Sequence, residues 1–176
     1  GPMTRGLQGD LVAGQPLAHD RIAGSAKHFI ADGGTLDGID QGNAPISEAE
    51  LIEIHAQGYV PAINAGVLTV MASFSSWNDV KITGNRSLLT DVLKHRMGFE
   101  GFVVGDWNAH GQIPGCSNES CPEAINAGLD MFMAPDSWRG LYLNTLAQAR
   151  SGEIPAERID DAVRRILRVK FKLGVF

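Results

Sequence analysis

Four apolar segments of strand length alternate with helix-type segments along this chain of 176 residues. They are residues 22–30, 67–72, 101–106 and 129–134. Short apolar runs of this kind are typical of strands that are buried on both faces of a parallel sheet. Repeated strand–helix units favour the same arrangement, with helices packed on the sheet. The sequence therefore predicts an α/β domain with four parallel strands.

The segment between the first two strands carries a helix start. Residues Ser47-Glu48-Ala49-Glu50 form a capping box, in which the serine hydroxyl accepts from the third helical N–H and Glu50 reaches back. The pattern predicts a helix that ends near Ala65-Gly66. One face of this helix is predicted to carry Leu51, Ile54, His55 and Val60.

Two more helices are predicted between the later strands. The first contains residues 88–93, and Gly98 closes it as a left-handed cap. The second is short. Residues Ser120-Cys121-Pro122-Glu123 predict its start, with proline in the first turn and glutamate at the capping-box position, and Gly128 ends it.

Two helices are predicted to close the chain, one over residues 137–150 and one after Pro155. The last helix is expected to carry one apolar face, formed by Ile159, Val163, Ile166, Leu167 and Phe171. On its other side, Asp160–Arg164 and Asp161–Arg165 are i,i+4 pairs. Such pairs on a solvated face contribute only about 0.2–0.5 kcal/mol each, so we expect them to have no function of their own.

The number of strands limits the architecture. A complete (β/α)8 barrel needs at least about 200 residues, and only four strands are predicted here. The domain is therefore either an open four-stranded α/β sheet or a (β/α)4 half of such a barrel. Gly1-Pro2-Met3 resembles a protease scar followed by an introduced start. We expect residues 1–4 to be an expression scar and residues 5–176 to be a single domain.

Composition and motifs disfavour several classes of function. Fifteen basic and twenty acidic residues give a net charge of −5, with no basic stripe of the kind that binds nucleic acid. No apolar run reaches the roughly 18 residues of a membrane helix. The glycines form neither G-x-G-x-x-G nor a P-loop, and the histidines show no metal-ligand spacing. We expect no cofactor, no metal, no nucleic acid and no membrane as partners.

The two cysteines leave a choice open. Cys116 and Cys121 are five residues apart, with no histidine between them, and match no zinc spacing. They form either a small disulfide on a loop, which suits an oxidising compartment, or two free thiols in a turn.

Polar residues at strand ends are the candidates for chemistry, because active sites of parallel α/β folds lie there. Asp106 follows a buried strand, where it is either a functional carboxylate or an Asx-type turn residue. Lys27 and His28 interrupt the first strand, and both can reach one ligand only if the strand ends or bulges there. Asp32 lies in the following Gly-rich turn and is a weaker candidate. The alternative for Lys27 is a solvated strand end, and for His28 a hydrogen-bonded, partly buried ring.

Aromatic and sulfur-containing residues near the strand ends have two interpretations. Trp77, Trp107 and Trp138 each follow a strand, and together they form either a stacking platform for sugar rings or ordinary packing. Met71 lies in the second strand, where methionine is most often a core residue.

Four motifs together resemble the family 3 glycoside hydrolases, in the branch of β-glucosidases and exo-glucanases. The motifs are Ala26-Lys27-His28-Phe29 with Asp32-Gly33-Gly34-Thr35, the run from Met71 to Asn78, the run from Gly101 to Trp107, and the run from Ala127 to Met133. They occur in the order of the family and cover nearly the whole chain. The resemblance implies the second half of a (β/α)8 barrel that belongs to a retaining glycosidase.

The resemblance also implies roles for individual residues. Asp106 matches the catalytic nucleophile, and Lys27 and His28 match residues that hydrogen-bond sugar hydroxyls. Trp107 and Met71 match residues that line the same subsite. Asp32 is assigned with them to substrate binding, and the implied substrate is a β-linked glucoside or gluco-oligosaccharide.

Some parts of the family pattern are missing. Phe74 stands where some members carry a tyrosine whose hydroxyl supports the nucleophile. The loop after Lys27-His28 has no histidine, so the hexosaminidase mechanism is not supported, and no acid/base is evident in residues 1–176. We expect a fragment with little or no activity alone, from a periplasmic or secreted parent enzyme. The alternatives are a self-assembling structural half-barrel and a non-catalytic carbohydrate-binding module.

Four strands in an open sheet leave two unpaired edges, which are templates for pairing with another chain. An isologous contact between two copies would cover both edges. We therefore expect a homodimer that closes a barrel-like core.

Overall fold

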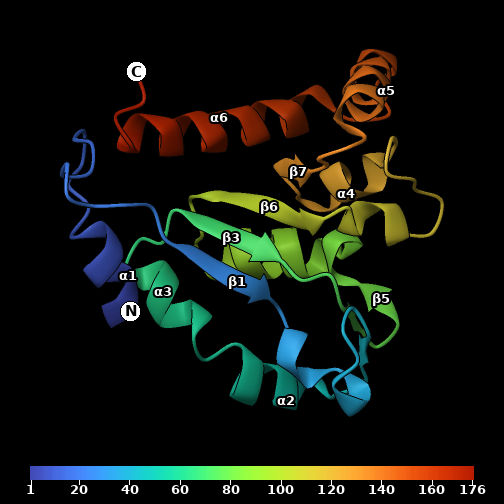
Figure 1. The fold of residues 1–176 in the computed structure, drawn as a ribbon, viewed down its shortest axis with the longest axis horizontal. Coiled ribbons are helices and arrows are strands. Elements are labelled where there is room, and N and C mark those ends of the chain that lie inside the picture. Colours follow the sequence, from blue (N-terminus) through green and yellow to red (C-terminus); the bar gives the residue numbers. More distant parts are fainter.

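The computed structural model describes residues 1–176 and contains a four-stranded parallel sheet (Figure 1). Its strands are β1 (Ser25–Phe29), β3 (Thr69–Ala72), β6 (Phe102–Trp107) and β7 (Met131–Met133). They lie in the order β1-β3-β6-β7, and every neighbouring pair is parallel. The predicted α/β fold with four parallel strands is confirmed. Strands β1 and β7 are the edges of the sheet, since each pairs with one neighbour only.

A second, three-stranded sheet was not predicted. Its strands are β2 (Asn43–Ala44), β4 (Ser76–Trp77) and β5 (Val80–Lys81), with β2 parallel to β4 and β4 antiparallel to β5. Two-residue strands are too short to show an alternating pattern in the sequence. The small sheet joins the loops that follow β1 and β3, and so fixes these loops near the carboxyl end of the main sheet.

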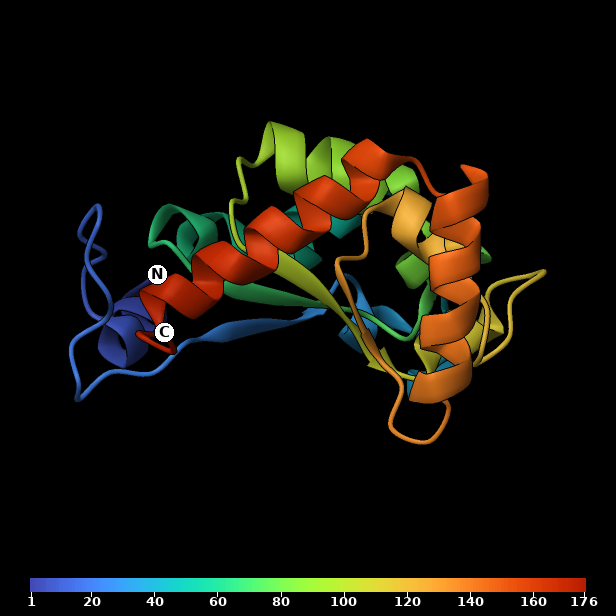
Figure 2. The ribbon, with the colours of Figure 1, turned by 90° about the horizontal axis from the view of Figure 1, so that it is seen from above.

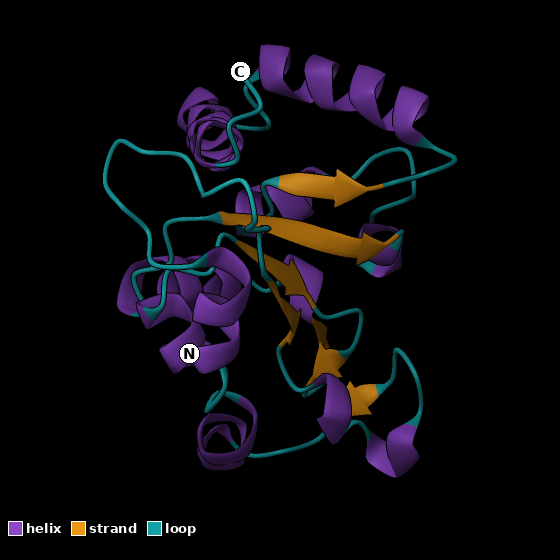
Figure 3. Ribbon diagram, turned by 60° about the vertical axis from the view of Figure 1, so that its left-hand side comes forward, coloured by secondary structure: helices purple, strands orange, loops and turns teal.

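The helices pack on one face of the main sheet, with α3 beyond β1 and α6 running along the sheet beside β6 (Figures 1 and 2). Only alternate residues of β3 and β6 are buried, so the other face is open and the expectation of strands buried on both faces is wrong. The α-helices are α1 (Pro2–Gln8), α2 (Glu48–Glu50), α3 (Tyr59–Asn64), α4 (Pro122–Ala127), α5 (Trp138–Ser151) and α6 (Ala156–Lys172). The 3-10 turns are η1 (Asp32–Gly34), η2 (Leu36–Gly38), η4 (Ile82–Gly84) and η6 (Ala109–Gln112), and the π-helical segments are η3 (Leu51–His55) and η5 (Ser87–Arg96). Figure 3 shows the strands and helices coloured by secondary structure. None of the helices combines the length and apolar character needed to cross a bilayer.

The first predicted helix starts as expected but does not continue as one regular helix. The capping box between Ser47 and Glu50 is present, which confirms the start at α2. The chain then passes through the π-helical η3 and a break before α3. The predicted apolar face is correct for Leu51, which is buried, but wrong for Ile54 and Val60, which are 64% and 49% exposed. The π turn and the break rotate the later positions, so that Tyr59 is buried instead.

The second predicted capping box is also wrong. Helix α4 starts at Pro122, with Cys121 as its N-cap and no side-chain cap. The hydroxyl of Ser120 instead accepts from Gln148 Nε2 of α5 at 3.0 Å. The side chain of Glu123 turns toward Cys116, with Oε2 3.1 Å from Sγ. Because a disulfide sulfur has no hydrogen to donate, this approach is a contact and not a hydrogen bond.

Helix α6 buries a different face from the predicted one. Ala162 and Val169 are buried, whereas Val163, Leu167 and Phe171 are 47%, 39% and 61% exposed. The predicted apolar face is therefore largely in solvent. The reason is electrostatic, because the helix turns its Asp161 side toward charged groups of the sheet and of η5.

These charged groups form an ion network that we name the clasp: Lys94, Asp130, Arg158, Asp161 and Arg165. Lys94 Nζ lies 2.7 Å from Asp130 Oδ1 and 3.3 Å from Asp161 Oδ2. Arg165 Nε lies 2.9 Å from Asp161 Oδ1, and Arg158 contacts both carboxylates. The expectation that Asp161–Arg165 lies on a solvated face is wrong, whereas Asp160–Arg164 is exposed as expected.

Residues 2–4 belong to the fold. They form the first turn of α1, which buries Thr4 and Gln8. Gln8 accepts from the amides of Gly24 and Leu68 at 2.9 and 3.1 Å, and donates to the Gly66 carbonyl at 2.8 Å. It therefore ties α1 to the amino-terminal ends of β1 and β3. That residues 1–4 are an expression scar stays a prediction.

Candidate functional site

Two strands of the main sheet carry an irregular step at the residues that the sequence singled out. Along β1, the register moves from Ala26↔Val70 to Phe29↔Ala72, three residues against two. Along β6, the register with β7 likewise moves three residues against two, between Val104 and Trp107. Such bulges redirect side chains and are common next to active sites. Lys27 and His28 lie in the first bulge and Asp106 in the second, so the condition that β1 must bulge is met.

The bulges bring His28 between two carboxylates. His28 Nε2 lies 3.7 Å from Asp106 Oδ2, and Nδ1 lies 3.1 Å from Asp32 Oδ2. The side chains of Asp106 and His28 are 23% and 29% exposed. Three predicted site residues thus come together at the carboxyl end of the sheet, in a position that a ligand can reach.

The two oxygens of Asp106 have different surroundings. Oδ1 accepts from the amide of the next residue, Trp107, at 2.7 Å. An Asx turn would need the amide two residues on, and the Asn108 amide donates to the Met133 carbonyl instead. Oδ2 faces His28. The contact with the Trp107 amide therefore holds the carboxylate in place and leaves one oxygen available.

Lys27 is not brought to Asp106 in the same way. Its side chain is exposed and forms none of the ion pairs within 4.0 Å. Of the two adjacent residues, only His28 lies within 4.0 Å of the Asp106 carboxylate. Lys27 nevertheless lines the same cavity as His28.

The three tryptophans do not share one environment. Trp77 is partly buried, and its Nε1 donates to the Ile46 carbonyl at 2.9 Å, which makes it a packing residue. Trp107 and Trp138 are 57% and 63% exposed. The packing interpretation therefore holds for Trp77, and Trp107 directly follows Asp106 in the sequence. Met71 is partly buried in β3, opposite Val104.

Phe74 makes no polar contact that replaces the missing tyrosine hydroxyl. Its ring has Lys81 Nζ at 5.5 Å from the centroid, and its carbonyl accepts from the same ammonium group at 3.1 Å. Partial burial lowers the pKa of Lys81. These contacts fix Phe74 to the small sheet.

A cavity with a volume of about 730 Å³ lies along the β1 edge of the sheet. Lys27, His28 and Asp32 line it from the sheet side, and His55 and Tyr59 line it from η3 and α3. Asp106 does not line it. Burial, and next the charge of Asp32, raise the pKa of Tyr59 well above its usual value. The tyrosine is thus neutral and serves as a wall of the cavity.

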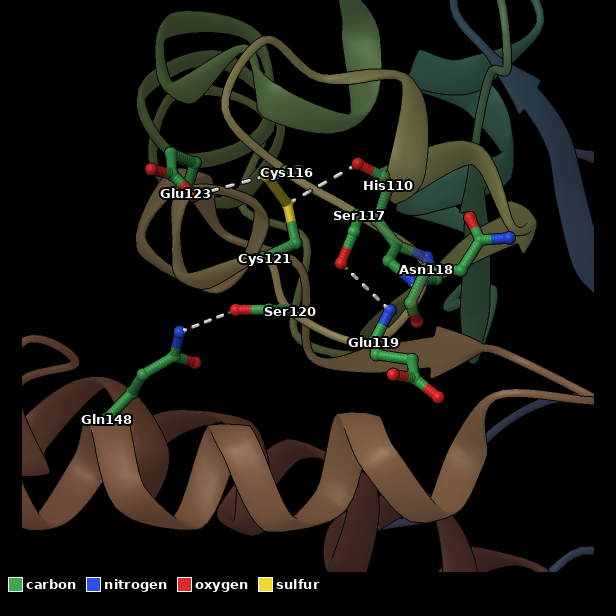
Figure 4. Close-up of a disulfide and its surroundings, with 9 residues drawn as sticks. All are labelled: His110, Cys116, Ser117, Asn118, Glu119, Ser120, Cys121, Glu123 and Gln148. Carbon is green, nitrogen blue, oxygen red and sulfur yellow. Dashed lines mark hydrogen bonds between the residues drawn. A yellow bond between two sulfur atoms is a disulfide. The ribbon is translucent and has the colours of Figure 1, made fainter.

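The loop after Asp106 is held by a disulfide between Cys116 and Cys121 (Figure 4). The loop docks on α5, where Ser137 Oγ donates to the Asn118 carbonyl at 2.8 Å and Asn144 Nδ2 to the Glu119 carbonyl at 2.8 Å. With Glu123 the cysteines form a cluster of possible metal ligands, but two sulfurs bonded to each other offer no thiolate.

His110 supports this loop from inside and was not predicted to have a role. It is 1% exposed, stacks edge-on against Phe132 with a centroid distance of 4.7 Å, and has Nε2 3.0 Å from the Asn118 carbonyl. Burial lowers its pKa, although the contact with Asn118 opposes the shift. A neutral ring therefore donates to the loop. No spacing signal marks this histidine, because its partners lie on other elements.

Comparison with known sequences identifies the group to which the chain belongs. Residues 1–169 match the model of the glycosyl hydrolase family 3 N terminal domain. The chain is 31% identical over 179 residues to the periplasmic beta-glucosidase of Salmonella typhimurium and 33% identical over 156 residues to a beta-glucosidase of Rhizobium radiobacter. These matches cover 99% and 88% of the chain but only 22% and 18% of the two relatives. The chain thus spans about a fifth of the length of these relatives.

Solved structures agree with the sequence matches. The exo-1,3/1,4-beta-glucanase of a Pseudoalteromonas species is 52% identical, with a TM-score of 0.94 over 99% of this chain and 22% of that chain. The beta-glucosidase of Listeria innocua, in a mutant complex with laminaribiose, is 27% identical, with a TM-score of 0.80 over 89% of this chain and 22% of that chain. The sheet, the order of its strands and the sequence matches together show that the chain belongs to glycosyl hydrolase family 3.

Proposed function

We propose that this chain carries the nucleophile and part of the sugar subsite of a retaining β-glucosidase-like hydrolase. The observation that carries the proposal is the position of Asp106, on a bulge at the carboxyl end of β6 with one oxygen held by an amide and the other free. A nucleophile needs such a fixed and accessible carboxylate. His28 and Lys27 supply hydrogen bonds to sugar hydroxyls, and Trp107 and Met71 line the subsite.

The mechanism requires a second carboxyl group. In a retaining glycosidase an acid about 5–5.5 Å from the nucleophile protonates the leaving oxygen. Asp32 contacts Nδ1 of His28, and no carboxyl group of residues 1–176 is evident as that acid. We propose that the acid/base belongs to another part of the active site, so that this chain alone hydrolyses glycosides weakly or not at all.

The proposed substrate is a β-linked glucoside or gluco-oligosaccharide. Relatives named beta-glucosidase and exo-1,3/1,4-beta-glucanase support this choice, as does the laminaribiose complex of the Listeria innocua enzyme. The disulfide fits an oxidising compartment. With the Salmonella relative named as periplasmic, this supports a periplasmic or secreted parent enzyme.

We also propose that the domain is a (β/α)4 half-barrel that completes itself as a homodimer. The two open edges of the sheet, β1 and β7, support this, because unpaired edges invite pairing. Exposed apolar side chains support it as well, among them Ile54, Val60, Val163 and Phe171. A structural half-barrel, whose function is this assembly, is the alternative that the open sheet favours.

One experiment separates an enzyme from a binding module. Tryptophan fluorescence follows the binding of laminaribiose, while release of dinitrophenol from dinitrophenyl β-glucoside follows bond cleavage without needing an acid. We expect saturable quenching and slow release, with release abolished in Asp106→Asn and unchanged in the exposed control Asp91→Asn. Quenching without any release would indicate a non-catalytic sugar-binding module. The absence of both quenching and release would contradict the proposed site.

A further inference from the structure

The carboxylate of Glu123 is turned onto the disulfide of the loop that follows Asp106 (Figure 4). Its Oε2 lies 3.1 Å from Sγ of Cys116, and the carboxylate takes part in none of the ion pairs of the structure. An ionised carboxylate only accepts hydrogen bonds, and a disulfide sulfur has no hydrogen to donate. The oxidised loop therefore offers this carboxylate no partner.

The second sulfur of the disulfide also faces an oxygen atom. Sγ of Cys121 lies 3.4 Å from the His110 carbonyl oxygen. Oxygen lone pairs beside both sulfurs suit a thiol hydrogen or a metal cation, and a disulfide supplies neither. The surroundings of Cys116 and Cys121 thus suit the reduced sulfurs.

Three donor atoms come together at this point. Sγ of Cys116, Sγ of Cys121 and a carboxylate oxygen of Glu123 all lie within 4.8 Å of one another. The Cα atoms of the two cysteines are 4.7 Å apart. Rotation of the reduced side chains can therefore open the sulfurs to the roughly 3.8 Å that separates two thiolates on a tetrahedral zinc ion with Zn–S bonds of about 2.3 Å. Cys116 is partly exposed and Glu123 is exposed, so a cation can reach them from solvent.

The loop is held on α5 by contacts that do not involve the sulfurs. Asn144 Nδ2 donates to the Glu119 carbonyl at 2.8 Å. Gln148 Nε2 donates to Ser120 Oγ at 3.0 Å. Because reduction of the disulfide removes neither hydrogen bond, we expect the two thiols to stay close to each other and to Glu123 in the reduced chain.

We propose that the reduced loop is a binding site for a thiophilic divalent cation, Zn²⁺, held by the thiolates of Cys116 and Cys121 and by one oxygen of Glu123, with water as the fourth ligand. Thiolate ligands select Zn²⁺ over hard cations such as Mg²⁺ and Ca²⁺. The disulfide and the metal are then alternative braces for the loop that follows Asp106. This inference goes beyond the proposed function, since it requires neither a sugar nor a nucleophile.

The change between the two braces is a thiol–disulfide exchange followed by metal binding. A dithiol reductant forms its own disulfide, and its two hydrogens pass to the sulfurs of Cys116 and Cys121 as the bond between them breaks. The cation then displaces both thiol protons, because a bound cysteine is a thiolate. Oxidation of the metal-bound thiolates by a disulfide reverses the exchange and releases the cation.

The test measures metal binding by the whole folded chain. The chain is reduced with a phosphine, which is removed without air, and is then titrated with Co²⁺ and afterwards with Zn²⁺. We expect one Co²⁺ per chain, with the ultraviolet charge-transfer absorption of a cobalt–thiolate bond, and we expect Zn²⁺ to abolish this absorption by displacement. The oxidised chain is expected to bind neither ion. Zn²⁺ should also slow the return of the disulfide in air.

Two variants separate the ligands from their surroundings. Glu123→Gln keeps both thiols and should weaken Zn²⁺ binding at least roughly tenfold, the loss that follows when even a supporting group of a metal ligand is removed. Glu119→Gln, an exposed carboxylate of the same loop, is the matched control and should bind like the native chain. Circular dichroism reports whether each reduced chain is folded. No cobalt–thiolate absorption in the folded reduced chain, equal affinities in Glu123→Gln and Glu119→Gln, or unfolding on reduction would overturn the proposal.

Discussion

Lys94 Nζ and Asp130 Oδ1 are 2.7 Å apart in the interior, with side chains that are 2% and 0% exposed. Asp130 Oδ2 also accepts from the Val103 amide at 2.8 Å. One carboxylate thus links η5, β6 and the segment that leads into β7, and Arg158 adds α6 to the same group. Burial lowers the pKa of Lys94, and the charge of Asp130 opposes this shift.

Removal of Asp130 is expected to destabilise the fold strongly. Asp130→Ala removes the fully buried one of the two carboxylates that Lys94 and Arg158 share, and breaking a buried ion pair costs about 3–5 kcal/mol. The matched control is Asp160→Ala, whose exposed pair with Arg164 at 3.5 Å contributes about 0–1 kcal/mol. Urea unfolding of both variants measures the difference. Equal free energies of unfolding in the two variants would show that the clasp does not stabilise the fold.

The clasp also predicts a loss of stability in acid. Burial raises the pKa of Asp161, but Lys94, Arg165 and Arg158 outweigh it and lower the pKa from 3.8 to about 2. A carboxyl group whose pKa is lower in the folded chain than in the unfolded chain stabilises the fold at pH values above its unfolded-state pKa. This stabilisation is lost as the pH falls through the folded-state pKa. We expect the stability gap between the native chain and Asp161→Asn to shrink from pH 4 to pH 2. Urea midpoints across this range test it, and a constant gap would exclude the mechanism.

The disulfide is expected to form in air-oxidised protein but to stabilise it only modestly. The loop from Cys116 to Cys121 is shorter than the 15-residue loop for which about 3 kcal/mol is expected. Peptide mapping without reductant should recover one linked peptide pair. The double variant Cys116→Ser/Cys121→Ser should lose less than about 3 kcal/mol of unfolding free energy. Two alkylatable thiols in the oxidised chain would contradict the pairing.

Association is the prediction that follows from the open sheet. We expect sedimentation to give a species at least twice the chain mass of 18.8 kDa at micromolar concentration. Ile54→Glu, at an exposed apolar position, should weaken the association, whereas Asp160→Ala should not. A stable monomer with a cooperative thermal transition would mean that the edges of β1 and β7 need no partner.

The sequence predicted the elements better than their faces. Val67–Ala72 and Gly101–Asp106 are continuous apolar runs, and both contain strands of the main sheet. The buried face of α6 was predicted wrongly, because apolar spacing does not show that Asp161 meets Lys94, which is 67 residues away. Interactions of this range depend on packing, which a local pattern cannot report.

The sequence predicted which residues belong to the candidate site but not which of them contact one another. His28 and Asp106 were identified as candidates because they interrupt or follow apolar strands. The short distance between His28 and Asp106 depends on two bulges, which no sequence pattern predicted. Lys27 was identified with His28 from the same motif, but it forms no ion pair with Asp106, and the sequence could not show this difference between neighbouring residues.

Covalent trapping tests most directly that Asp106 is the nucleophile. Dinitrophenyl 2-deoxy-2-fluoro-β-glucoside carries a leaving group that needs no acid, and its fluorine slows hydrolysis of the glycosyl-enzyme. We expect the intact chain to gain one fluoroglucosyl group, mapped by peptide sequencing to Asp106, and we expect no gain in Asp106→Asn. The control Asp91→Asn should be labelled like the native chain. A label on another carboxylate would contradict the assignment. So would the absence of any label in a chain that binds laminaribiose saturably.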